Sequence, residues 1–188
     1  NLRFHMKKFI VLLFLSLQFF AISEASAACN LSQFSFGSSL KDVEVKLKYL
    51  EADKLHANSS FFATGDKVSL GLSAEQVCEG DKEFIGAHII MIFLYDKLVE
   101  LNLYKFIESG DNPGLIYWAE SVYGEKNPKP PSFYEPEPSA FWFWRGLDST
   151  ASYSLESIAY GIDELVTIQT NKYQDLYSKY SAELESGN

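Results

Sequence analysis

One stretch decides the fold of this chain, Ile89-Ile90-Met91-Ile92-Phe93-Leu94-Tyr95-Asp96-Lys97-Leu98-Val99-Glu100-Leu101-Asn102-Leu103. Its first six residues are continuously apolar, which is typical of a strand in the centre of a sheet. After the polar turn at 95–97, apolar and polar residues largely alternate, as in a strand with one buried face. We therefore predict a β-hairpin within Phe84–Phe106, with one arm near the centre of the sheet.

Shorter periodic segments on either side predict the other elements. Apolar residues at helical spacing predict helices at Ser39–Glu51, capped by Ser38 or Ser39, at Leu115–Tyr123, stopped by Gly124, and at Asn171–Glu185, capped by Asn171. Alternation predicts strands at 34–37, 67–72, 141–145, 151–158 and 164–170. This order gives an α+β fold with an antiparallel sheet or sheets and about three helices, in which a helix-then-meander theme occurs twice.

The start of the chain has the features of an export signal. Met6-Lys7-Lys8 is basic, an apolar run follows, and Ala25-Ser26-Ala27-Ala28 supplies the small residues of a cleavage site. We expect cleavage after Ala27, with residues 1–5 an upstream extension, and hence a periplasmic or secreted protein. An uncleaved anchor fits less well, because polar residues interrupt the run before it reaches about 18 apolar residues.

Cleavage would leave residues 28–188, a length typical of one domain. We predict a single compact α+β domain without a transmembrane segment. Two packed halves, 28–110 and 111–188, are the alternative, because the sequence does not show whether the two groups of strands form one sheet or two.

The chain has two cysteines, Cys29 and Cys78. In an oxidising compartment such an isolated pair predicts one disulfide. A bridge that closes a loop of about 50 residues contributes roughly 4 kcal/mol in the chain-entropy account. The alternative is a lipid-bearing Cys29, but Ser26 stands where bacterial lipoprotein signals usually place leucine.

Acidic residues dominate the exported part of the chain. Without the signal the chain would carry 13 basic and 24 acidic residues. Because such a surface repels phosphate groups, we expect no nucleic-acid partner and no attraction to anionic lipid. The negative charge either keeps the exported protein in solution or meets a basic partner.

Motifs for catalysis and for metal binding are scarce. His56 and His88 are far apart and lack cysteines or carboxylates at ligand spacing, so we expect no metal and no other cofactor. Carboxylate pairs are the remaining route to chemistry, and they occur at Glu135 and Glu137 in a proline-rich loop, at Asp163 and Glu164 in a predicted turn, and at Glu120 on a helix. Solvated surface charge also explains them.

Aromatic residues gather around the proline-rich loop. Phe133-Tyr134 lies within it, and Phe141-Trp142-Phe143-Trp144-Arg145 follows. Neighbouring residues of a strand point to opposite faces, so aromatic side chains occupy both faces. Since aromatic residues and arginine are favoured at interfaces, we predict a binding site at Tyr134, Trp142, Trp144 and Arg145. Packing against Trp118 or a second layer is the other interpretation.

Two segments resemble a family of small envelope proteins. Phe36-Gly37-Ser38-Ser39-Leu40-Lys41-Asp42-Val43 before a helix, and the later hairpin Ile92–Val99, are similar to the layout of the SmpA/OmlA and β-lactamase-inhibitor-like group. The likeness covers the first half of the exported chain and implies a non-enzymatic binding module.

Taken together, these features predict an exported protein that binds and does not catalyse. It would be a cell-envelope accessory, or an inhibitor or immunity protein, whose partner is another protein or an envelope component. The alternative from another class is an envelope glycan hydrolase that uses Glu135 or Glu137 as its acid, with Trp142 or Trp144 as a stacking platform.

Overall fold

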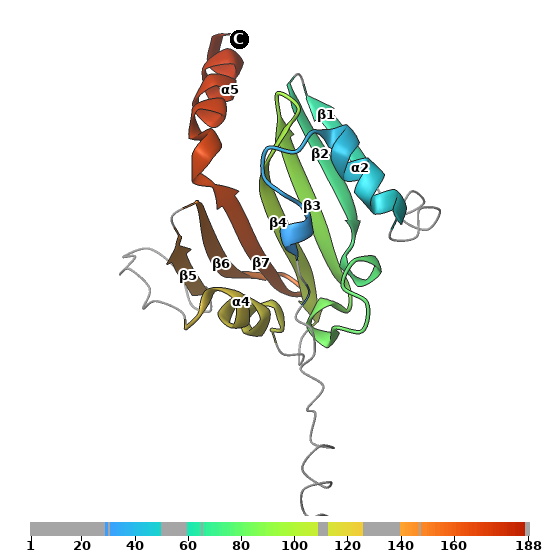
Figure 1. Cartoon of the computed structure of the whole chain (residues 1–188). Coiled ribbons are helices and arrows are strands. Elements are labelled where there is room, and N and C mark those ends of the chain that lie inside the picture. The colour runs from blue at the N-terminus through green and yellow to red at the C-terminus, as the bar shows by residue number, and fades with distance from the viewer. Residues whose placement is uncertain are drawn as a thin grey trace, which may run out of the picture.

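The described residues form one antiparallel sheet with helices on both of its faces (Figure 1). The computed structural model describes Cys29 and residues 31–49, 60–64, 66–108, 113–125, 140–146 and 148–186. Within these ranges the seven strands are ordered β1-β2-β3-β4-β7-β6-β5. The predicted α+β class is confirmed.

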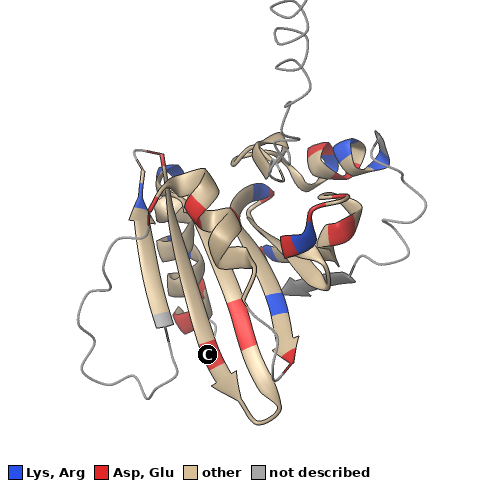
Figure 2. Cartoon of the chain, turned by 90° about the horizontal axis from the view of Figure 1, so that it is seen from below, with Lys and Arg blue, Asp and Glu red and all other residues tan. Residues whose placement is uncertain are grey.

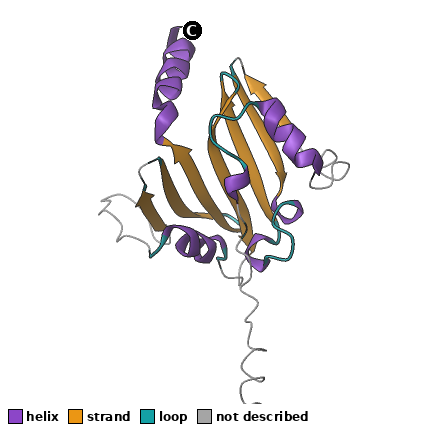
Figure 3. Cartoon of the chain, in the orientation of Figure 1, coloured by secondary structure: helices purple, strands orange, loops and turns teal. Residues whose placement is uncertain are grey.

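The strands are β1 (Ser60–Thr64), β2 (Lys67–Ser73), β3 (Ala87–Leu94), β4 (Lys97–Glu108), β5 (Ala140–Arg145), β6 (Ser149–Ile158) and β7 (Gly161–Thr170). The α-helices of the described residues are α2 (Leu40–Tyr49), α4 (Leu115–Tyr123) and α5 (Gln174–Ser186). Short 3-10 turns are η2 (Leu31–Gln33), η3 (Ala74–Gln76), η4 (Lys82–Phe84) and η5 (Asn171–Tyr173). Figure 3 shows how the helices border the sheet.

The predicted hairpin is β3–β4, and β4 is the central strand of the sheet. β4 also pairs with β7, from Glu100 opposite Gln169 to Glu108 opposite Gly161. This pairing joins the first group of strands to the second, so the two parts of the chain share one continuous sheet.

Both faces of β3 are covered, which explains its continuous apolar run. Ile89, Met91 and Phe93 belong to the main core, together with side chains of α2, α4 and the segment 29–36. Ile92 and Leu94 point to the other face, where they pack against α5. A strand with helices on both faces is apolar at nearly every position, whereas His88, near the start of β3, is exposed.

Helix α5 is held on its face by one polar network as well as by apolar contact. The Tyr177 hydroxyl donates to Glu100 Oε2 at 3.0 Å, and Gln169 Nε2 donates to the same oxygen at 2.6 Å. Burial raises the pKa of Tyr177 and the Glu100 charge adds to that shift, so its hydroxyl stays protonated as a donor. No residue of α5 is fully buried.

Three local predictions differ from the structure. Residues 34–37 form no strand, because Gly37 has a φ of +88° and turns the chain after η2. Strand β1 was not predicted, since only five residues pair with β2 there. The cap before α5 is Thr170, whose hydroxyl accepts from the Lys172 amide and begins η5, and it is not Asn171.

The prediction that Asp163 and Glu164 lie at a solvated turn is wrong. The turn is at 158–161, and both residues belong to β7. Asp163 accepts a hydrogen bond from the Tyr104 hydroxyl at 2.7 Å, which raises the pKa of Tyr104. Glu164 is 0% exposed and lies opposite Lys105 of β4 in the ladder. Figure 2 shows acidic and basic positions on the strands and helices of the described chain.

The buried Glu164 carboxylate caps helix α4 from the neighbouring sheet. Its Oε2 accepts from the Gly114 amide at 3.1 Å, and its Oε1 accepts from the Ile116 amide at 3.2 Å and from the Tyr153 hydroxyl at 2.9 Å. Gly114 precedes α4 and has no side chain that could cap the helix. A carboxylate from β7 therefore satisfies the free amides and complements the helix dipole.

Replacing Glu164 by alanine should lower the free energy of unfolding by about 3 kcal/mol, because two amides and the Tyr153 hydroxyl lose their buried acceptor. Urea denaturation followed by circular dichroism measures this loss. Glu156→Ala is the matched control, since Glu156 is an exposed glutamate of the adjacent strand and should change little. Equal losses in the two variants would contradict the capping role.

Candidate functional site

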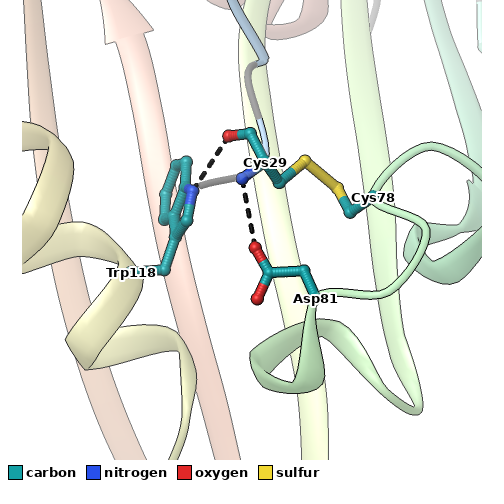
Figure 4. Close-up of a disulfide and its surroundings, with 4 residues drawn as sticks. All are labelled: Cys29, Cys78, Asp81 and Trp118. Atoms are coloured by element: carbon teal, nitrogen blue, oxygen red, sulfur yellow. Dashed lines mark hydrogen bonds between the residues drawn. A yellow bond between two sulfur atoms is a disulfide. The ribbon is translucent and has the colours of Figure 1, made fainter. Parts of the chain in front are cut away.

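The predicted disulfide between Cys29 and Cys78 is present (Figure 4). The backbone of Cys29 is also held on both sides: its amide donates to Asp81 Oδ2 at 3.1 Å, and its carbonyl accepts from Trp118 Nε1 at 3.0 Å. The bridge and these two bonds tie the segment 29–36 to the η3–η4 region and to α4. Because the Cys29 sulfur belongs to the disulfide, that sulfur carries no acyl chain.

A pocket of about 500 Å³ lies between the segment 29–36, helix α4 and the sheet. Leu101 and Ile168 of the sheet form its floor. The remaining lining comes from Cys29, Leu31, Ser32, Phe34, Ser35, Phe36, Trp118, Val122, Tyr123 and Ser149. Its volume falls within the range of small-molecule sites, which is about 300–1,000 Å³.

In the part of the chain that the structure describes, the lining residues carry no carboxylate, imidazole, ammonium or guanidinium group. Burial raises the pKa of Tyr123 to about 12, so its phenol stays neutral at ordinary pH. The Trp118 indole already donates to Cys29, and three serines supply the other polar groups. The pocket therefore offers apolar contact and a few neutral hydrogen-bonding groups.

Aromatic side chains brace the α4 wall of the pocket. Trp118 meets Phe84 edge to face with ring centroids 5.6 Å apart, and it meets Tyr123 at 6.1 Å. Tyr123 in turn lies 6.0 Å from the Trp144 ring. At the rim, Val122 is 48% exposed, and Ser32 and Ser35 are exposed as well, so these residues mark where the pocket meets solvent.

The structure separates the residues of the predicted aromatic site. Trp142 and Trp144 share one face of β5, since they lie opposite Tyr153 and Ala151 of the core. Trp144 is 4% exposed and donates from Nε1 to the Gly124 carbonyl. Arg145 lies on the other face, with its guanidinium 5.3 Å from the Phe143 ring.

Trp142 and Trp144 therefore lie together on the face of β5 that faces α4, and Arg145 lies on the opposite face. Trp142 is half-buried and packs 5.3 Å from Tyr153, and Trp144 supports the pocket residue Tyr123 from behind. Tyr134, the fourth residue of the predicted site, lies outside the described residues.

Several other predicted features also lie outside the described residues: the export signal, His56, Glu135 and Glu137. His88 is exposed near the start of β3, and Glu120 is half-buried on α4. In the described ranges, no group of three or more histidine, cysteine or acidic side chains is arranged to hold a metal ion. None of their helices is long and apolar enough to cross a membrane.

Sequence reasoning did not identify the pocket residues. Part of the signal is present in the sequence, because Leu31, Phe34 and Phe36 follow Cys29 closely, but the alternation of Phe34 and Phe36 predicts a short strand. The sequence predicts that Val122 and Tyr123 belong to a helix, but it does not predict that they line a pocket. The pocket depends on contacts between distant segments, which no local pattern displays.

Comparisons with protein-family models, curated proteins and solved structures found no match to the chain. The resemblance to the SmpA/OmlA and β-lactamase-inhibitor-like group stays a prediction. The geometry of the pocket is therefore the main guide to function.

Reducing the disulfide should lower the free energy of unfolding by about 4 kcal/mol, because the unfolded chain regains the freedom of a long loop. Comparing urea denaturation with and without dithiothreitol measures the change. The reductant acts on this bond alone, since the chain has no other cysteine. Unchanged stability would show that the bridge does not constrain the segment 29–36.

Proposed function

We propose that this protein is an exported binding protein that holds a small apolar molecule in the pocket between the segment 29–36, α4 and the sheet. The observation that carries the proposal is the neutral, mostly apolar lining of a pocket of about 500 Å³. Apolar clefts with a few polar groups are the usual form of small-molecule sites. Burial of apolar ligand surface would supply the affinity, at about 25 cal/mol per Å².

Two features support a periplasmic or secreted location. The chain starts with the pattern of an export signal, and one wall of the pocket is fixed by the Cys29–Cys78 bridge. Disulfides persist in oxidising compartments and are rare in reducing ones. A pocket whose wall depends on such a bridge would be best maintained outside the cytoplasm.

Among the binding roles, a cell-envelope accessory fits this pocket better than an inhibitor or immunity protein. Capture of a basic toxin would use the acidic surface, whereas the described residues of the pocket lining are uncharged. The envelope contains many apolar acyl chains, which match the lining chemically. A glycan hydrolase would place carboxylates in its cleft, and the described residues that line this pocket include none.

An apolar fluorescent probe, N-phenyl-1-naphthylamine, should bind the oxidised wild-type protein and gain fluorescence. Val122→Trp should weaken its binding at least tenfold, because a large side chain at the rim would fill part of the pocket; tenfold corresponds to about 1.4 kcal/mol. A fluorescence titration gives the dissociation constants.

The matched control is Val45→Trp, which places the same change on α2, where Val45 is 44% exposed and lines no part of the pocket. It should bind the probe as the wild type does. If both variants bind equally well, or if the wild type does not bind, the pocket is not the site.

A further inference from the structure

Asp81 is a buried carboxylate with too few partners. It is 8% exposed, and its Oδ2 accepts one hydrogen bond, from the Cys29 amide at 3.1 Å (Figure 4). Its Oδ1 is buried and accepts no hydrogen bond from an amide, a hydroxyl or a cationic group of the described residues. Buried charges are normally paired with an opposite charge, so one amide is a poor match for this group.

A second acid lies beside Asp81. A hydrogen bond with the Asp81 side chain raises the pKa of the Glu83 carboxyl, and the Asp81 charge adds to that rise. Lys105 is the neighbouring cation, but its Nζ donates to the Glu83 carbonyl at 3.2 Å and not to either carboxylate. Asp81, which lies beside the Cys29 nitrogen, therefore has a second acid as its neighbour, and Lys105 does not pair with its carboxylate.

Cleavage of the export signal can supply a cation for Asp81, namely the α-ammonium group of the mature chain. Export peptidases require small residues at the first and third positions before the cut. Ala25 and Ala27 meet this requirement for a cut after Ala27, and Ser26 and Ala28 meet it for a cut after Ala28. The second cut makes the Cys29 nitrogen the amino terminus of the mature chain.

We infer that the export peptidase cuts between Ala28 and Cys29, and that the new α-ammonium of Cys29 pairs with Asp81. The inference rests on the export step of the proposed function and moves the expected cut by one residue. Water hydrolyses the Ala28–Cys29 peptide bond, the new carboxylate leaves with Ala28, and the freed amine takes up a proton. That nitrogen already lies 3.1 Å from Asp81 Oδ2.

Of the two possible cuts, only the one before Cys29 places the new α-ammonium group beside Asp81. An ammonium group offers three donors and a positive charge, whereas an amide offers one neutral donor. A cut after Ala27 would leave the Cys29 nitrogen as an amide and move the ammonium one residue away. With the cut at Cys29, the first residue of the mature chain is held through its nitrogen by Asp81, its carbonyl by Trp118 and its sulfur by Cys78.

The first test is the start of the mature protein. The whole chain is expressed in an exporting bacterium, purified without reductant, and its intact mass and N-terminal peptide are determined by mass spectrometry. We expect residues 29–188 with the disulfide formed and no lipid. A start at Ala28 or elsewhere overturns this inference and leaves export standing, whereas an uncut chain overturns both. Probe binding by the same preparation tests the pocket separately.

The second test measures the α-amine directly. Acetic anhydride labels free amines, and mass spectrometry of the N-terminal peptide gives the rate for the α-amine alone. The carboxylate should raise the pKa of the amine above its usual value of about 8, so labelling at pH 8 should be about tenfold faster in Asp81→Asn than in wild type. By linkage, the pair's stabilising contribution is complete below the unfolded-state pKa and is lost as pH rises through the folded-state pKa.

Glu79→Gln is the matched control, because Glu79 is an exposed acid of the same loop, and its labelling rate should equal that of wild type. Circular dichroism checks that every variant is folded. If Asp81→Asn fails to fold, Glu83→Gln takes its place and should also speed labelling. Labelling at the wild-type rate in a folded Asp81→Asn variant, or in its replacement, overturns the pairing.

Discussion

The Glu164 carboxylate is the interaction on which the rest of the described structure depends. It sits on β7 and accepts from two amides at the start of α4, so it fixes where that helix meets the sheet. Helix α4 then presents Trp118, which holds the Cys29 carbonyl. The position of the segment 29–36, and with it the pocket, follows from this chain of contacts.

Local periodicity was enough to predict most elements of the fold and little of the site. The hairpin β3–β4 and the bounds of α4 can be recognised from neighbouring residues, because burial imposes a repeat on them. The cap of α4 cannot be recognised in this way, because Gly114 and Glu164 are 50 residues apart in the sequence. The residues next to Glu164 form no pattern that would mark it as the cap of a helix. Strand β1 was missed for a different reason, because a five-residue pairing leaves too short a repeat.

The aromatic segment shows where reasoning from one strand stops. Alternation correctly indicated that its side chains occupy both faces, but it could not show what covers each face. In the structure Trp144 packs among core residues, while Phe143 on the other face meets the Arg145 guanidinium. Residue types favoured at interfaces are equally suited to a core with hydrogen-bonding groups, as the Trp144 bond to Gly124 shows.

The two faces of the sheet have separate apolar clusters, and this separation has a consequence for the C-terminal helix. α5 covers Ile92, Leu94 and Val99 without burying any residue of its own completely, and it shares no cluster with the pocket. Such a helix is a unit of low local stability that can undock while the main core stays intact. Undocking would expose Ile92 and Leu94, the second apolar row of β3, and an exposed apolar row of this kind favours self-association.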